Sequence, residues 1–193
     1  VTSRTAVGLC LEGVNKIMKK EAKNIFCLTR PPGHHALNTG KDEGFCFYNH
    51  VAISAKYIQN KYKLKKILIV DWDYHHGNST EFFFYDDPSV LFFSTHDQFA
   101  YPGTGSPLRR GEGDGLGFNI NIHLPCGTSD NDIIKAFELK LIQKAIDFNP
   151  DFILISAGFD SRKNDLLGCY NITDKGFVKL TKIIMNIAEK TCD

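Results

Sequence analysis

The sequence predicts an α/β protein of three layers (αβα), in which a mainly parallel central sheet lies between helices. Short apolar runs alternate with segments of helical periodicity, which is the pattern of a parallel sheet covered on both faces. The run at residues 67–70 is apolar at every position, as expected for a strand buried on both faces. With 193 residues, 42% of them hydrophobic and 23% charged, the chain can bury a sizeable core. We therefore expect residues 1–193 to belong to a single domain.

Five segments place apolar residues at the spacing of an amphipathic helix. The first of them has Val7, Leu11 and Val14 on one face. Asp130 is the expected cap of the fourth, because its carboxylate can accept a hydrogen bond from the first turn. The predicted helices cover residues 4–20, 49–62, 79–85, 130–148 and 173–190.

Five shorter runs are predicted to be strands, at residues 25–28, 67–70, 90–93, 118–122 and 152–155. Four of them are continuous apolar runs, which predict burial, whereas residues 118–122 alternate between apolar and polar side chains and predict a more exposed strand. A glycine-rich passage at residues 101–117 is predicted to be a loop. It lacks the Lys-Ser/Thr pair of a phosphate-binding P-loop.

Composition and charge exclude several functional classes. The formal net charge of +1 gives no support for broad attraction to nucleic acid or membranes, and no apolar stretch is long enough to span a bilayer. None of the six cysteines forms a C-x-x-C pair, so we expect buried free thiols in a reducing compartment rather than a disulfide framework. A cytoplasmic location is expected, or a nuclear one if the source is eukaryotic. We predict no direct nucleic-acid or membrane partner, and an oligomer is compatible with the sequence.

Polar side chains follow the predicted buried strands, where open α/β sheets place their chemistry. They are His34 and His35, then Asp71, Asp73, His75 and His76, then Ser94 and His96, and finally Asp160. Asp73 and His75 alternate by two, so continued strand geometry would direct both to the same side. With Asp160 they would form a three-ligand site with an open position, as in catalytic zinc centres. A polar loop without a ligand is the alternative.

Five motifs in this order resemble one family. They are RPPGHHA at residues 30–36, GFCFYN at 44–49, DWDYHHGN at 71–78, YPGTG at 101–105 and SAGFD at 156–160. The chain resembles the zinc-dependent histone deacetylases, which include bacterial amidohydrolase relatives acting on acetylpolyamines. The Pro-Pro-Gly-His-His sequence and Asn78 are more similar to the class II and bacterial branches. The resemblance implies the arginase/deacetylase fold.

The resemblance implies a role for several residues. Asp73, His75 and Asp160 match the zinc ligands. His35 matches the base that activates the attacking water, and His34 its electrostatic or acid partner. Asp71 would orient His34, and Asn78 would orient His35. An amide at position 78 should leave His35 less basic than a carboxylate would.

The resemblance also implies a substrate tunnel and potassium sites. Gly44, Phe45 and Tyr101 match the substrate-binding walls around the acyl-lysine chain. An inner potassium site would use Asp71, Asp73, His75, Ser94 and Thr95. An outer one would use Phe84, Asp87, Val90 and Phe118.

The implied activity is zinc-dependent hydrolysis of the acetyl amide of acetyl-lysine, in histones or other proteins. An acetylated polyamine or another small amide is an alternative substrate. A catalytically inactive member that binds acyl-lysine or partner proteins is a second alternative. An arginase-like dinuclear manganese hydrolase is a third, but it needs further bridging aspartates where this sequence offers an aromatic tunnel.

One family residue falls outside the sequence. The transition-state tyrosine of the family lies beyond Asp193, and Tyr170 belongs to a different, structural segment. The resemblance therefore implies a fragment truncated at both ends. We expect such a fragment to bind zinc and to catalyse poorly, because an oxyanion donor commonly contributes about 3 kcal/mol.

Overall fold

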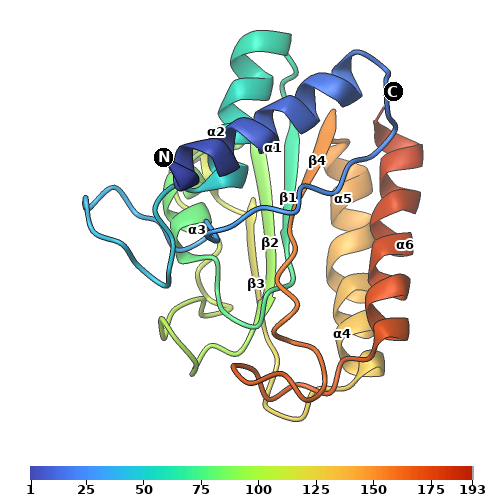
Figure 1. The fold of residues 1–193 in the computed structure, drawn as a ribbon. Helices are drawn as coiled ribbons and strands as arrows, with labels where there is room; N and C mark the ends of the chain where they lie inside the picture. The colour runs from blue at the N-terminus through green and yellow to red at the C-terminus, as the bar shows by residue number, and fades with distance from the viewer. Residues whose placement is uncertain (193) are drawn as a thin grey trace.

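A four-stranded, fully parallel sheet forms the centre of the computed structural model, which describes residues 1–192 (Figure 1). The strand order is β3-β2-β1-β4, and the strands are β1 (Ile67–Asp71), β2 (Val90–His96), β3 (Asn119–His123) and β4 (Phe152–Ser156). The register pairs Asp71 with Ser94 on one side and with Ser156 on the other. The predicted three-layer α/β fold is confirmed.

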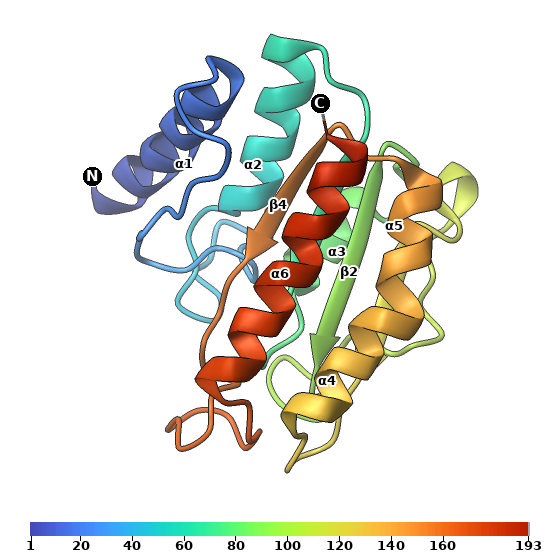
Figure 2. The same ribbon diagram turned by 90° about the vertical axis from the view of Figure 1, so that its right-hand side faces the viewer.

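Helices cover both faces of the sheet (Figures 1 and 2). One face carries α4 (Asp130–Ala136), α5 (Ile142–Phe148) and α6 (Asp174–Thr191), with the π-turn η3 (Phe137–Leu141) between the first two. The other face carries α2 (His50–Tyr57), which continues into the π-turn η1 (Ile58–Tyr62), and α3 (Asn78–Phe84). Helix α1 (Thr2–Met18) packs against α2, and a short 3-10 turn η2 (Gly113–Gly115) lies in the glycine-rich loop.

The core is divided by the sheet because successive strand residues point to opposite faces. Leu68 and Val70 of β1 join the apolar cluster under α4, α5 and α6, whereas Ile67 and Ile69 join the cluster under α2. All four side chains are inaccessible to solvent. The continuous apolar run at residues 67–70 is therefore explained by burial on both faces.

The predicted strand at residues 25–28 is wrong. This segment does not join the sheet, and the side chains of Phe26 and Leu28 are 65% and 87% exposed. Its inward-facing residues contact α1 instead, since a Cβ built on Gly13 would meet Cys27 Sγ at 2.8 Å and Ile25 Cγ2 at 3.4 Å. The apolar run is short, and half of it serves this contact with a helix.

Strand β4 is less buried than predicted. Phe152 is buried, but Ile153, Leu154 and Ile155 are half-buried. The reason is position, because β4 lies at one edge of the sheet formed by the described residues. An all-apolar run predicts that both faces of a strand are buried, but it does not show whether another strand pairs with each of its edges.

The start of α4 also differs from the prediction. Ser129 caps the helix, and its hydroxyl and backbone N–H donate to Asp132 Oδ2 at 2.6 and 2.9 Å. Asp130 instead accepts from the backbone N–H and hydroxyl of Thr173, at 2.7 and 2.6 Å. Asp130 therefore ties the start of α4 to the start of α6.

The prediction of unpaired cysteines is wrong for one pair. Cys126 and Cys169 form a disulfide, with their Cα atoms 5.2 Å apart and a separation of 43 positions in sequence. Burial was also overestimated, because Cys46 is buried whereas Cys10 and Cys27 are half-buried. No helix among residues 1–192 combines the length and hydropathy needed to cross a membrane.

Candidate metal centre and active site

The candidate site lies at the carboxyl edge of the parallel sheet. Asp71 is the last residue of β1, and Asp73 and His75 follow it directly. Asp160 follows β4, the neighbour of β1, four residues after Ser156. Two strands that are far apart in sequence thus deliver their loops to one place.

Asp73, His75 and Asp160 come together there. A ligand atom of each lies within 4.8 Å of the other two, and all three side chains are half-buried. His75 Nδ1 is 2.8 Å from Asp160 Oδ2 and 3.1 Å from Asp73 Oδ1. The expected convergence of the two carboxylates and the imidazole is therefore present in the geometry.

The carboxylates are held in place by backbone groups. Asp73 Oδ1 accepts from the His75 backbone N–H at 2.8 Å, and Asp160 Oδ1 accepts from the Tyr74 backbone N–H at 3.0 Å. Gly158 packs so closely on the Asp73 carboxylate that a Cβ there would overlap it. Two carboxylates and one imidazole are a donor set suited to zinc, and three protein ligands leave a position open. The residues present fit a catalytic zinc ion.

His34 lies beside this set and is held by Asp71. His34 Nδ1 is 2.9 Å from Asp71 Oδ2, and both side chains are buried. Its Nε2 is 3.7 Å from Asp73 Oδ2. Burial alone would lower the pKa of His34, but the charges of Asp73 and Asp71 outweigh it and raise the pKa to about 9. His34 is therefore suited to carry a proton.

His35 has the opposite character. Its Nδ1 is 2.7 Å from Asn78 Oδ1, and its ring lies 4.0 Å from the His34 ring, centroid to centroid. Burial, together with repulsion from His34, lowers the pKa of His35 to about 3. The neighbouring histidines thus differ in basicity because two carboxylates face His34, whereas burial and the charge of His34 dominate at His35.

The predicted substrate walls border His35. The Tyr101 ring meets the His35 ring edge-on at a centroid distance of 5.0 Å. A Cβ built on Gly44 would meet both His35 and Tyr101, so glycine allows this close approach. Phe45 has a positive φ of 65° and is 74% exposed, which presents its ring to solvent at the rim.

The residues suggested for potassium lie around the ends of β1 and β2. Ser94 is buried and its hydroxyl is 2.8 Å from His96 Nδ1, whereas the buried Thr95 hydroxyl has no hydrogen-bond partner among residues 1–192. For the outer group, the Phe84 carbonyl accepts from the Asp87 N–H at 3.2 Å, and the Asp87 carbonyl accepts from the Val90 N–H at 3.3 Å. The remaining member is the Phe118 carbonyl, which accepts from the Phe92 N–H at 2.9 Å.

A buried polar network beside the site was not predicted. The strand at residues 118–122 was expected to expose its polar positions, but Asn119 and Asn121 are each 3% exposed. Both donate to Glu81 Oε2, at 2.9 and 2.6 Å. The alternation predicted the strand correctly. Its polar side chains face inward rather than toward solvent, because they have a buried hydrogen-bond partner. A glutamate directly before three consecutive phenylalanines of α3 was the available signal.

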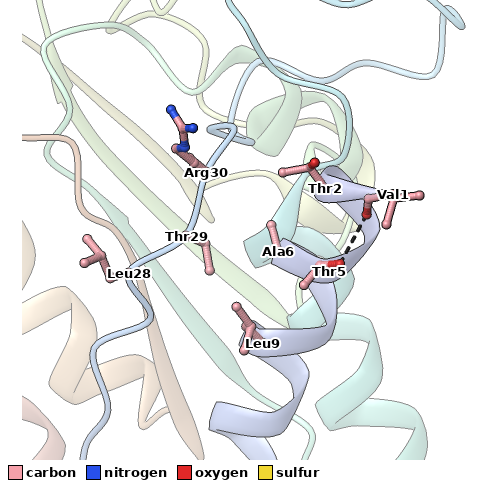
Figure 3. A pocket seen from close by; sticks show the side chains of 8 residues that line it. All are labelled: Val1, Thr2, Thr5, Ala6, Leu9, Leu28, Thr29 and Arg30. Atoms are coloured by element: carbon pink, nitrogen blue, oxygen red, sulfur yellow. Dashed lines mark hydrogen bonds between the residues drawn. The ribbon is translucent and has the colours of Figure 1, made fainter.

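A separate hollow near the amino terminus carries none of this chemistry (Figure 3). It has a volume of about 340 Å³ and lies between α1 and residues 28–30. Arg30 is the one ionisable side chain among its lining residues. The metal-ligand group lies outside it.

The fold and the site together define an α/β protein with a candidate metal centre. A three-donor set leaves one position open for a further ligand, and two adjacent buried histidines lie beside it.

The comparisons name the family. A sequence profile of the histone deacetylase domain matches residues 1–193. The chain is 40% identical to "Histone deacetylase clr3" of Schizosaccharomyces pombe, over 97% of this chain and 28% of that protein. It is 43% identical to "Histone deacetylase 9" of Homo sapiens, over 97% of this chain and 19% of that protein. The crystal structure of the HDA15 HD domain matches 99% of this chain and 54% of that chain, with a TM-score of 0.93 and 39% identity.

The chain therefore belongs to the histone deacetylase family, and the resemblance drawn from its motifs, class II branch included, is confirmed. It spans less than a third of the length of these two curated relatives.

Proposed function

We propose that this chain carries the catalytic centre of a zinc-dependent deacetylase that hydrolyses the acetyl amide of acetyl-lysine in histones or other proteins. One observation supports this most directly. Two adjacent buried histidines of opposite basicity, each with its own partner, lie beside a three-donor metal set. Residues 1–193 would form part of one deacetylase domain.

Asp73, His75 and Asp160 would hold the zinc ion in this proposal. When bound, zinc supplies Lewis-acid chemistry, which polarises an amide carbonyl and lowers the pKa of water. The backbone N–H groups of Tyr74 and His75 keep the two carboxylates aimed at the site without help from the ion. Such outer hydrogen bonds commonly tune metal affinity.

The two histidines would divide the proton transfers of amide hydrolysis. We assign His35 as the general base, because its lowered pKa keeps it neutral and able to accept a proton from the attacking water. His34, held by Asp71, would keep a positive charge beside the reacting carbonyl. A histidine then protonates the leaving lysine nitrogen, and the products are acetate and the free amine.

The walls of the site suit an uncharged acyl-lysine side chain. Gly44, Phe45 and Tyr101 would line the entrance, and aromatic rings are good packing partners for an alkyl chain. Gly44 leaves room for His35 and Tyr101 to approach each other. A deacetylated lysine carries a charge that such walls disfavour, which would assist product release.

Potassium would bind beside the zinc site. We propose an inner ion held by Asp71, Asp73, His75, Ser94 and Thr95, and an outer ion held by Phe84, Asp87, Val90 and Phe118. The register, which pairs the buried Asp71 with the buried Ser94, supports the inner site.

An acetylated protein is favoured as substrate over an acetylated polyamine, because the relatives reported above are named histone deacetylases. We propose a cytoplasmic location, or a nuclear one if the source is eukaryotic. Both follow from the substrate class.

The test is hydrolysis of an acetyl-lysine peptide and of an acetylated polyamine, measured on this chain and on the natural protein that contains it. Zinc-dependent acetate release that a chelator abolishes, faster from the peptide, is the expected result. Faster release from the polyamine would show that the acetylated polyamine, and not the acetylated protein, is the preferred substrate. Two manganese ions per chain would favour the arginase-like alternative. If the natural protein binds the peptide without turnover, the alternative of a catalytically inactive acyl-lysine-binding member would be favoured.

A further inference from the structure

We propose that Glu81 is a positioning residue that fixes the Tyr101 wall of the acyl-lysine tunnel against the metal centre. The inference rests on the proposed function, because it concerns the substrate wall of the same site. Glu81 lies on α3 and is 4% exposed.

The Glu81 carboxylate joins three parts of the fold. Arg109 Nε of the glycine-rich loop donates to Glu81 Oε1 at 2.6 Å. Asn119 and Asn121 of β3 donate to Oε2. His76 Nε2, directly after the candidate ligand His75, lies 3.4 Å from the same oxygen.

The carboxylate keeps its charge in this network. Burial alone would raise the pKa of Glu81, but the nearby His76 ring and the hydrogen bonds from Asn121 and Arg109 outweigh burial and lower the pKa to about 2. A charged acceptor holds its donors more strongly than a neutral one. The charged Glu81 carboxylate can therefore restrain the loop and the strand whose side chains donate to it.

The loop is held at both ends of residues 104–109. Thr104 Oγ1 is 2.7 Å from His76 Nδ1, and the Arg109 carbonyl accepts from Asn119 Nδ2 at 2.7 Å. Between them, the Gly105 carbonyl is 2.9 Å from His96 Nε2. Asn119 and His76 both contact Glu81. The His96 ring packs against the His76 ring, with their centroids 4.5 Å apart. All three contacts therefore connect the loop to the surroundings of Glu81.

A cleft of about 750 Å³ lies beside this loop, and both Glu81 and Asn78 line it. Phe82 and Phe99 also line this cleft and are 53% and 80% exposed. On the same side, the Arg109 guanidinium lies 4.4 Å from the centroid of the Tyr85 ring, and the Glu112 N–H donates to the Tyr85 carbonyl at 2.9 Å. The Glu81 network therefore restrains this segment together with its contacts to Tyr85.

Tyr101 lies three residues before Thr104, the first residue of the restrained segment, and its ring contacts His35. A shift of the loop would change how Tyr101 packs against Gly44 and His35, which it contacts together. We therefore expect Glu81 to act on substrate binding through Tyr101, with less effect on the chemical step.

The experiment compares Glu81→Gln with Glu112→Gln, a matched substitution of an exposed glutamate that lines the same cleft. Hydrogen exchange of residues 101–109 and the KM and kcat for an acetyl-lysine peptide are measured on the whole chain and on the natural protein that contains it. For Glu81→Gln, loss of the charged hydrogen bonds should speed exchange in this segment by about tenfold or more. KM should rise by a similar factor of about ten, with kcat changed less than about threefold. Glu112→Gln should match the wild type.

Arg109→Met provides a second variant if Glu81→Gln fails to fold. The Arg109 side chain is 50% exposed, so its removal leaves the core intact while it deletes one of the two 2.6 Å hydrogen bonds to Glu81. It should speed exchange in the same segment. Unchanged exchange in residues 101–109, or equal acceleration in β1 and α6, would overturn the proposal. A wild type that exchanges as expected but never hydrolyses the peptide would instead overturn the proposed function.

Discussion

Replacing the amide of Asn78 with a carboxylate should make His35 more basic. Asn78 Oδ1 lies 2.7 Å from His35 Nδ1, and the His35 side chain is 3% exposed, so solvent screens the pair weakly. In Asn78→Asp a new negative charge would face the imidazole at hydrogen-bond distance. An adjacent opposite charge typically raises the pKa of a histidine by ~1–3. This corresponds to ~1.4–4 kcal/mol of added stabilisation of the protonated ring.

The consequence for catalysis has a definite sign. A general base works when neutral, so the acidic limb of the pH profile of kcat/KM follows its pKa. From a starting pKa of about 3, the limb in Asn78→Asp should move to higher pH by the same ~1–3. Activity below the new limb should fall while the plateau above it is retained.

Two measurements check this prediction. The pH dependence of kcat/KM is recorded with an acetyl-lysine peptide, and the His35 ring is titrated by NMR in labelled protein, which does not depend on turnover. Asn78→Ala is the control, because it removes the hydrogen bond without adding charge and should not raise the pKa of His35. A His35 titration that is the same in Asn78→Asp and wild type would refute the reasoning.

Three further predictions follow from the structure. Asp160→Ala should weaken zinc binding by more than the ~10–100-fold that is typical when a hydrogen-bond partner of a metal ligand is lost. The control is Asp165→Ala, which changes an exposed aspartate. It should leave the metal content, measured by mass spectrometry, unchanged. Burial lowers the pKa of His50, so below about pH 6.5 the unfolded chain binds a proton that the native state does not. Stability should therefore fall by up to ~1.4 kcal/mol per pH unit from this group as pH decreases, and urea titrations of His50→Gln should show a shallower dependence. Reduction of the Cys126–Cys169 disulfide should lower the free energy of unfolding by about 2–4 kcal/mol, since it closes a loop of 43 residues. The free energy of unfolding of Cys126→Ser should then be the same with and without reductant. A decrease as large as that of the wild type would contradict this prediction.

The fold could be predicted wherever periodicity and burial agreed. Residues 67–70 are buried on both faces, and the helix predicted at 173–190 is observed as Asp174–Thr191. The prediction failed for residues 25–28, where apolar side chains contact α1 or solvent. It was incomplete for β4, because hydrophobicity does not reveal which strand lies at an edge. These features depend on partners that are distant in sequence.

The sequence by itself determined the residue types of the site and their order along the chain. Asp73, His75 and Asp160 could be named from the motifs because short-range spacing at strand ends limits where side chains can point. The tertiary structure decided what the surroundings do to them. It placed carboxylates beside His34 and buried His35 next to the charge of His34, which separates their pKa values.

The tertiary structure alone also decided the roles of Glu81 and of the Cys126–Cys169 pair. Glu81 lies on α3, whereas its partners come from β3 and the glycine-rich loop, and no local pattern marks them as neighbours. The two cysteines lie 43 positions apart and meet because two loops close on each other. Hydrogen bonds and disulfides act over a few ångströms, so they are specified by the folded arrangement rather than by spacing along the chain.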